Sequence, residues 1–242
     1  MLRKENRETT QIRPVNFEMD INNYAEGSCI VSYGNTRVLC TASLEENVPR
    51  WLQNTNKGWV TAEYSMLPRS THTRIRRDKA MSGGRSQEIS RLIGRALRSC
   101  VDMSAIPEKS IIVDCDVIQA DGGTRTASIT GGFVALARAL EFLKQQDLIK
   151  TNPLKFQVAA LSSGLVNNKP LVDLDYDEDS NCDSDINFVF TSKNELIEVQ
   201  GTAEGAPFNS ESFQNLLNLT QKESELLFQK QKQALGWETL LA

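Results

Sequence analysis

Residues 111–132 read IIVDCDVIQADGGTRTASITGG, and this stretch decides the fold because it joins a strand, a glycine turn and a helix without interruption. The β-branched run that starts at Ile111 stops at Asp121-Gly122-Gly123, as expected of a strand that ends in a turn. From Thr124 onward, apolar residues recur every three or four positions, which predicts a helix. The predicted buried stripe of this helix consists of Ile129, Phe133, Leu136, Leu140 and Leu143.

The start of this helix is suited to an anion. Unpaired N–H groups and a partial positive charge at a helix start favour an oxyanion, and Arg125 adds a forked, permanently charged donor. We therefore expect a phosphate here. The alternative is an ordinary helix start with Gly122-Gly123 as its turn, since the stretch matches neither GxxxxGK[ST] nor GxGxxG. Within the helix, Gly131-Gly132 indicates close packing beneath the site, because glycine weakens a helix interior.

Composition narrows the class of protein. The chain has 242 residues, of which 40% are hydrophobic and 24% charged, as in a soluble globular protein. No apolar run reaches the length of a membrane span and the N-terminus lacks a secretory h-region, so we expect a cytoplasmic location and no membrane partner. The net charge of −4 argues against a protein that coats nucleic acid over its whole surface.

Cysteine and histidine usage excludes several kinds of site. The five cysteines are odd in number and show no CxxC spacing, so reduced core thiols are expected rather than disulfides or zinc ligands. The single histidine, His72, excludes a His-rich metal site and argues against a Ser/His/Asp triad.

The order of elements predicts a single α+β domain over residues 1–242. The first sixty-odd residues read as antiparallel strands with a tight turn at Gly34-Asn35, and a further strand covers residues 57–67. The remaining predicted elements are a helix from about 86 to 102, the strand 111–118, the helix 124–145, two strand hairpins, and a helix from about 210 to 235.

A basic loop lies between residues 68 and 85. Its charges are Arg69, Arg74, Arg76, Arg77, Lys79 and Arg85 against the one acid Asp78. Arginines among hydroxyl side chains are typical of contacts to an RNA backbone, and the alternative is a solvated loop that serves solubility. Arg85 differs from the others because it follows Gly83-Gly84 at the start of a predicted helix, where a guanidinium and free amides can bind one anion.

An acidic segment covers residues 173–185. Its carboxylates are Asp173, Asp175, Asp177, Glu178, Asp179, Asp183 and Asp185. Such density is destabilising unless a cation or an arginine cluster neutralises it. The spacing fails as an EF-hand, which leaves a magnesium site held by one or two carboxylates and by substrate phosphate, or an acidic turn between strands. Asp179 and Asp185 are the better ligand candidates, because Asp185 begins the strand INFVF.

Together these segments resemble bacterial members of the ribonuclease PH family of phosphorolytic exoribonucleases. The resemblance runs through nearly the whole chain, and the matching segments are RPVNFEMD, EGSCIVSYGNTRVLCTAS, KGWVTAEYSMLPRST, GRSQEISRLIGRALR, DVIQADGGTRTASITGG, LDYDEDSNCDSDINFV and EVQGTAEGAPF. It implies an α+β fold of the ribosomal protein S5 domain 2-like type. It also implies that inorganic phosphate attacks the terminal phosphodiester of RNA and releases nucleoside diphosphates, a reaction that can run in reverse.

The resemblance also assigns roles to residues. By similarity, the attacking phosphate is held by Arg85, Gly123, Thr124 and Arg125. Asp179 and Asp185 correspond to a pair of catalytic acids that hold a divalent metal, expected to be Mg²⁺, or assist protonation of the leaving oxygen. The loop that carries Arg69, Arg74, Arg76 and Arg77 corresponds to a segment associated with tRNA binding.

The implied substrates are tRNA precursors trimmed toward the CCA end, together with other structured RNA 3′ ends, including those met in rRNA processing. The implied assembly is a homo-hexamer, a trimer of dimers. Two alternatives remain: a catalytically silent ring subunit that binds RNA, and a hydrolytic ribonuclease that needs no phosphate pocket.

Overall fold

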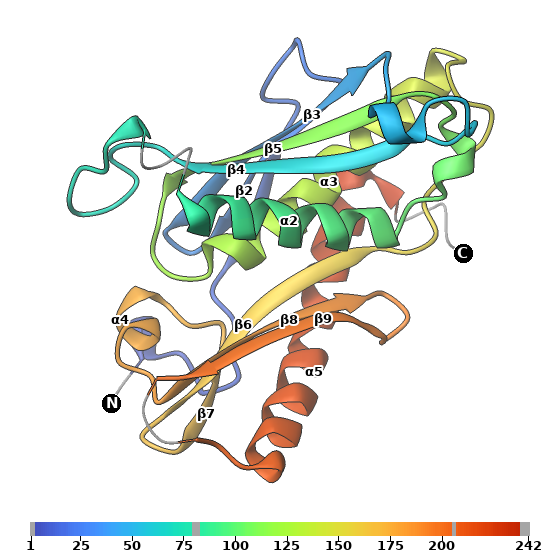
Figure 1. Cartoon of the computed structure of the whole chain (residues 1–242). Helices are drawn as coiled ribbons and strands as arrows, with labels where there is room; N and C mark the ends of the chain where they lie inside the picture. Colours follow the sequence, from blue (N-terminus) through green and yellow to red (C-terminus); the bar gives the residue numbers. More distant parts are fainter. Residues whose placement is uncertain (1–2, 79–82, 205–206, 238–242) are drawn as a thin grey trace.

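The computed structural model describes residues 3–78, 83–204 and 207–237, which form two β-sheets and the helices packed on them (Figure 1). The first sheet has the strand order β1-β2-β3-β5-β4. Its strands are β1 (Val15–Met19), β2 (Gly27–Tyr33), β3 (Thr36–Glu45), β4 (Trp59–Met66) and β5 (Ser110–Gln119). The β2–β3 hairpin closes at Gly34, which has a φ of 54°, and this confirms the predicted turn.

One strand of the first sheet differs from the prediction. The pattern placed residues 57–67 among antiparallel strands, but β4 pairs with β5 in parallel, from Trp59 opposite Ser110 to Met66 opposite Val117. The helix α2 (Gly84–Ser99) provides the crossover between them, as a parallel pair requires. A repeated apolar pattern identifies a strand but carries no information about its direction relative to a neighbour.

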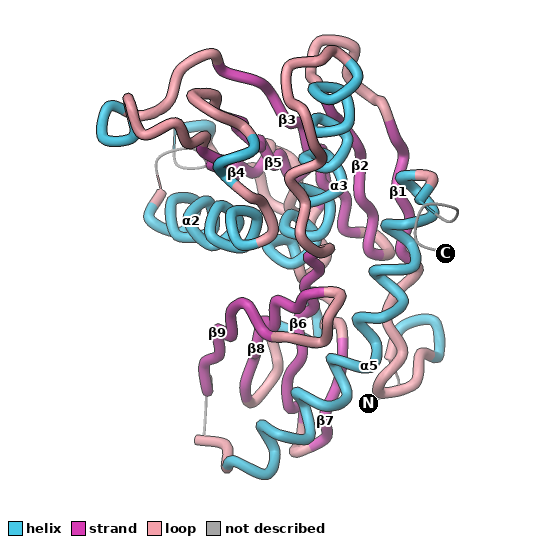
Figure 2. The backbone as a smooth tube through the Cα atoms, turned by 90° about the vertical axis from the view of Figure 1, so that its right-hand side faces the viewer, coloured by secondary structure: helices cyan, strands magenta, loops and turns pink. Residues whose placement is uncertain are grey.

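The second sheet is antiparallel and has the strand order β7-β6-β8-β9. Its strands are β6 (Val158–Val166), β7 (Lys169–Val172), β8 (Ser184–Thr191) and β9 (Leu196–Ala203). They form the two predicted hairpins, but residues after Val172 leave the sheet and form the short helix α4 (Tyr176–Asp179). The helix α5 (Ser210–Leu235) runs along this sheet and contacts β6 and β7 (Figure 2). Short 3-10 helices lie at Lys4–Asn6, Arg50–Leu52 and Met103–Ala105.

The helix α3 (Thr124–Gln145) lies between the sheets and contacts β2 and β3 on one side and β6 on the other (Figures 1 and 2). All five residues of the predicted stripe are buried, and burial extends around most of the helix. Among helices of the described residues, α3 alone has the length and apolar character of a membrane span, and 83% of that stretch is buried inside the protein. It is therefore a core helix.

Gly131 allows α3 to approach the first sheet closely. A Cβ at this position would lie 2.4 Å from Val31 Cγ1 and 2.9 Å from Cys40 Sγ, too close for any larger residue. Gly132 has only ordinary contacts, the nearest at 3.4 Å to Val113 Cγ1. The predicted close packing is thus confirmed at the first of the two glycines.

One cluster of buried apolar side chains continues from the first sheet through α3 into the second sheet and α5. All five cysteines are free and buried, which confirms the prediction of reduced core thiols. The α+β class is also as predicted.

Candidate active site

The glycine turn between β5 and α3 has the geometry that an anion site needs. Gly122 and Gly123 have φ values of 76° and 65°, in the left-handed region that glycine adopts without strain. Gly123 is the N-cap of α3 and no side chain caps this helix start, so amides of its first turn are available to a ligand. The buried hydroxyl of Thr36 donates to the Gly122 carbonyl at 2.6 Å and fixes the turn.

The side chains of Thr124 and Arg125 are held by residues that sequence reasoning did not identify. The hydroxyl oxygens of Thr124 and Tyr64 are 2.9 Å apart. Arg125 Nη1 donates to Gln200 Oε1 at 2.6 Å, and Gln200 Nε2 donates to Glu88 Oε1 at 2.6 Å. These partners come from β4, α2 and β9, and no local pattern connects such distant segments of the chain.

Arg85 stands at the start of α2 in the same arrangement. Gly83 is the N-cap of α2 with no side-chain cap, and Arg85 is the second residue of the helix, just as Arg125 is the second residue of α3. Arg85 is exposed and makes no hydrogen bond or ion pair with another residue of the described chain. Two uncapped helix starts thus each carry one arginine.

The charges of the two arginines act on a shared pair of carboxylates. Asp179 ends α4 and Asp185 is the second residue of β8. Asp179 is an exposed residue, yet partial burial of its carboxyl raises the pKa of this group, and the charge of Asp185 raises the pKa further. Loss of solvation likewise raises the pKa of Asp185. Arg85 and Arg125 lower both pKa values, so all four groups share one electrostatic neighbourhood.

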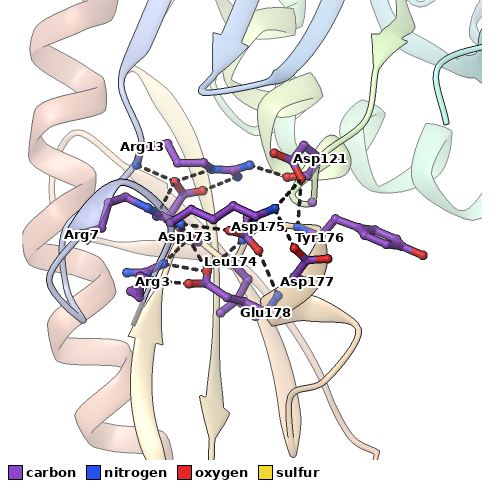
Figure 3. Close-up of polar contacts among 12 residues, drawn as sticks. Arg3, Arg7, Arg13, Asp121, Asp173, Leu174, Asp175, Tyr176, Asp177 and Glu178 are labelled. Carbon is purple, nitrogen blue, oxygen red and sulfur yellow. Dashed lines mark hydrogen bonds and ion pairs between the residues drawn. The ribbon is translucent and has the colours of Figure 1, made fainter. Parts of the chain in front are cut away.

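The buried part of the acidic segment is neutralised by arginines from the N-terminal segment (Figure 3), whereas the exposed Asp177 pairs with Lys4 at 2.8 Å. Arg13 Nη2 lies 2.6 Å from Asp173 Oδ1, and Arg3 Nε lies 2.7 Å from Glu178 Oε1. Arg7 Nη2 lies 3.3 Å from Glu178 Oε2. All five side chains of the arginine pairs are nearly inaccessible to solvent, so these residues are a buried ion-pair cluster and not an exposed acidic turn.

This cluster connects the acidic segment to the glycine turn. Arg13 Nη1 donates to the Asp121 carbonyl, and the Tyr176 amide lies 3.4 Å from Asp121 Oδ1 (Figure 3). A Cβ on Gly122 would lie 2.5 Å from the Leu174 carbonyl oxygen, so the two backbones are in direct contact. The contact holds α4, and with it Asp179, beside the start of α3.

The predicted RNA-binding residues Arg69, Arg74, Arg76 and Arg77 are all exposed. Their loop is tied to the end of β5 by the hydrogen bond from the Ala120 amide to the Ser70 carbonyl, at 2.8 Å. The rings of His72 and Tyr176 are 6.0 Å apart, so the loop lies beside α4 at the rim of the site. Arg76 is paired with Asp78 at 2.8 Å. Lys79 lies outside the described residues.

The structure therefore brings together the predicted phosphate residues Gly123, Thr124 and Arg125 at one helix start, and it places Arg85 near the same two aspartates. The roles assigned to these residues stay predictions. No group of three or more metal-binding His, Cys, Asp or Glu side chains occurs in the described part of the chain. A metal held here would have two protein carboxylates at most and would need oxygen atoms from a bound substrate.

Comparisons with known proteins place this chain in a family. The family model for domain 1 of the 3′ exoribonuclease family matches residues 11–140, and the model for domain 2 of the same family matches residues 157–223. Ribonuclease PH of Bdellovibrio bacteriovorus is 54% identical over 235 residues, which cover 97% of each chain. Ribonuclease PH of Brucella ovis is 53% identical over 238 residues, which cover 97% of this chain and 100% of that protein.

Solved structures share the fold. Rrp46 of rice (Oryza sativa) superposes with a TM-score of 0.79 at 18% identity, over 96% of this chain and 100% of that one. A chain of the Archaeoglobus fulgidus exosome, solved with RNA bound to the active site, has a TM-score of 0.80 at 22% identity, over 94% of this chain and 92% of that one. With the family matches, these likenesses confirm the predicted α+β ribonuclease PH fold. The chain therefore belongs to the 3′ exoribonuclease family and matches ribonuclease PH along almost its whole length.

Proposed function

We infer that this chain is a phosphorolytic 3′ exoribonuclease, a tRNA nucleotidyltransferase of the ribonuclease PH type. The identity of 53–54% to ribonuclease PH over nearly the full length of both chains supports the activity. The observation that carries the site is the pair of uncapped helix starts, each with an arginine whose charge acts on Asp179 and Asp185.

The geometry fits a reaction between two phosphates. An oxygen of inorganic phosphate attacks the terminal phosphodiester, a new P–O bond forms, and the bond to the preceding 3′ oxygen breaks. That oxygen takes up a proton, and a nucleoside diphosphate leaves; the reverse reaction adds a nucleotide. Two anions must approach each other, so the site needs fixed positive groups, and Arg85, Arg125 and the α3 amides supply them. No nucleophilic side chain is required.

Asp179 and Asp185 are proposed to hold Mg²⁺ together with substrate phosphate. Mg²⁺ is typically bound by one or two carboxylates plus phosphate oxygens, and a cation relieves both the burial and the repulsion from Asp185 that raise the pKa of Asp179. A bound divalent ion supplies charge neutralisation of the reacting phosphates. The same raised pKa values also suit a proton donor to the leaving oxygen.

Mn²⁺ binding distinguishes these two roles. If both aspartates are ligands, Asp185→Asn weakens binding of Mn²⁺, measured by electron paramagnetic resonance in the presence of phosphate. If Asp185 acts as a proton donor only, the variant binds Mn²⁺ as the parent does and loses turnover.

The substrates, the assembly and the location of the protein are proposed on the same basis. The substrates are tRNA precursors and other structured RNA 3′ ends, including rRNA, with the basic loop of Arg69, Arg74, Arg76 and Arg77 against the RNA backbone. The assembly is a homo-hexamer built as a trimer of dimers, in the cytoplasm. Sedimentation of the 27.0 kDa chain tests the assembly, with a mass of six chains expected and a stable monomer as the contrary result.

A phosphate-dependence experiment tests the activity. The purified protein is incubated with a tRNA that carries extra 3′ nucleotides, with and without inorganic phosphate. Phosphorolysis yields nucleoside diphosphates only when phosphate is present. Nucleoside monophosphates that form regardless of phosphate indicate a hydrolytic enzyme, and intact RNA under all conditions indicates a silent RNA-binding subunit.

A further inference from the structure

A chain of hydrogen bonds across three elements holds Arg125. Gln200 on β9 accepts from Arg125 Nη1 through Oε1, and it donates to Glu88 on α2 through Nε2; both bonds are 2.6 Å long. The Gln200 amide thus lies between the Arg125 cation and the Glu88 carboxylate. Its oxygen therefore faces the arginine and its nitrogen faces the carboxylate. Its orientation is set by the two charges beside it.

The residue hydrogen-bonded to Arg125 is neutral, and the Glu88 carboxylate forms only a longer ion pair with it. Glu88 Oε1 lies 3.8 Å from Arg125 Nη1, beyond hydrogen-bond distance, with the Gln200 amide making the direct contact. Guanidinium has five N–H donors, and an amide that accepts from Nη1 neither neutralises the charge nor occupies the full fork. A carboxylate at the same place would form the strong bidentate pair that arginine favours and would compete with phosphate.

The strand register places the Gln200 side chain on the same sheet face as Asp185. Gln200 pairs with Asn187, and Thr202 pairs with Asp185. Side chains alternate along a strand, so Gln200 and Thr202 share one face, and that face also carries Asp185. Glu198, two residues before Gln200, binds Arg95 of α2 at 3.0 Å on the same face. The strand β9 thus holds α2 through Glu198 and Arg125 through Gln200.

We propose that Gln200 and Glu88 are positioning residues that set Arg125 toward the attacking phosphate without placing a carboxylate in direct contact with its guanidinium. The proposal rests on the phosphorolytic function inferred above. Neither residue touches the reacting atoms in this account; Gln200 acts through Arg125, and Glu88 acts by orienting the Gln200 amide.

Steady-state kinetics with phosphate as the varied substrate test the proposal. Gln200→Glu places a carboxylate on Arg125, so we expect the phosphate KM to rise about tenfold or more, which corresponds to ~1.4 kcal/mol, with kcat at saturating phosphate little changed. The RNA KM should stay near that of the parent. Gln214→Glu adds the same charge at an exposed position of α5 and should leave every constant unchanged.

Two further comparisons separate positioning from folding. The exchange Glu88→Gln with Gln200→Glu keeps the hydrogen-bonding groups and total charge, and a purely structural role predicts that it restores the parent KM. The proposal predicts that it does not, because a carboxylate still lies on Arg125. The phosphate KM of Gln200→Glu, relative to the parent at each pH, should also fall as acid protonates the new carboxyl.

Failure of the proposed function and failure of the positioning role give different results. If the parent protein degrades RNA without phosphate, the proposed function is wrong. If the parent requires phosphate but folded Gln200→Glu keeps the parent KM, the positioning role is wrong. Should Gln200→Glu not fold, Gln200→Met provides the second test: it removes the acceptor for Arg125 Nη1 without changing the charge and should raise the phosphate KM, and an unchanged KM overturns the proposal.

Discussion

Arg125 carries the only charge in the first turn of α3, and its side chain donates a hydrogen bond to Gln200, far along the chain, and lies 3.8 Å from Glu88 Oε1. Phosphate binding at this helix start needs a cation held in a fixed place, since a mobile cation would lose entropy each time it bound phosphate.

Arg125→Ala should largely abolish phosphorolysis. Loss of one fixed donor to a reacting oxyanion typically lowers rates about 10²- to 10³-fold, and we expect this loss with assembly unchanged. Phosphate-dependent release of nucleoside diphosphates measures the effect, and sedimentation checks assembly. Arg37→Ala, which removes an arginine from the exposed pair with Glu18, is the control. Parent-like phosphate dependence in Arg125→Ala would remove this residue from the site.

Gly122→Ala should destabilise the protein through local backbone strain. Gly122 has a φ of 76°, and an added Cβ would lie 2.5 Å from both the Leu174 oxygen and the Asp175 carbonyl carbon. Such strain costs roughly 1–3 kcal/mol. Gly84→Ala is the matched control, because nothing lies within 4 Å of its added Cβ. Chemical denaturation of both variants gives the comparison, and equal stabilities would contradict the observed backbone contact.

At the scale of elements, the N-terminal segment and the acidic segment fold against each other through buried charge. Burial alone raises a carboxyl pKa, but Arg13 offsets this effect and holds the pKa of Asp173 below its ordinary value. Burial also opposes ionisation of Glu178, where the hydrogen bond and charge of Arg3 lower the pKa. These pairs fix the segment that ends at Asp179.

Asp173→Asn should cost about 3–5 kcal/mol of unfolding free energy, because it leaves the buried Arg13 without its carboxylate partner. Glu18→Gln, which breaks the exposed pair with Arg37, should cost no more than about 1 kcal/mol. Urea denaturation of the two variants measures both values. Equal small losses would show that the cluster contributes little to stability.

The depressed pKa values also set a pH window. Ionised Asp173 and Glu178 stabilise the fold fully above their ordinary values of about 4, and this contribution is lost as the pH falls through the lowered folded values. The parent should therefore lose stability below about pH 4 more steeply than Asp173→Asn does.

Much of this architecture could be predicted from the sequence. The helix predicted at 124–145 is α3, and the predicted 210–235 helix is α5, because each has a clear helical period between turn residues. The density of carboxylates from Asp173 to Asp185 indicated that some positive group must compensate it. The sequence could not show that Arg3, Arg7 and Arg13 are that group, because they lie more than 150 residues away and pair only through the tertiary fold.

The residues of the site that form a local pattern could be predicted from the sequence, but the contacts between distant elements could not. The glycine turn and the arginine after it are a local pattern, so Gly123, Thr124 and Arg125 could be selected from the sequence. Tyr64, Glu88 and Gln200 carry no such signal, because each acts only through a partner on another element.

At the scale of the whole molecule, one apolar cluster joins the two sheets through α3. Val31 of the first sheet and Phe188 of the second are both fully buried members of it. Although two family models match separate parts of the chain, buried apolar side chains of both parts belong to this one cluster, which argues against either part unfolding alone.

We therefore propose that residues 1–242 fold as one domain with a single unfolding transition. Hydrogen exchange is carried out at increasing urea concentrations and a fixed protein concentration, and is measured by mass spectrometry. The amides of β3 and β8 should lose protection at the same urea midpoint. Separate midpoints for the two strands would indicate two domains.

The origin of the second phosphate in the product tests the central claim most directly. The protein is supplied with an RNA that has extra 3′ nucleotides and with ³²P-labelled inorganic phosphate, and the released nucleotides are separated. The account predicts that the label appears in nucleoside diphosphates, at the β position, because inorganic phosphate is the nucleophile bound by Arg85 and by the start of α3. Unlabelled nucleoside monophosphates as the product would contradict it.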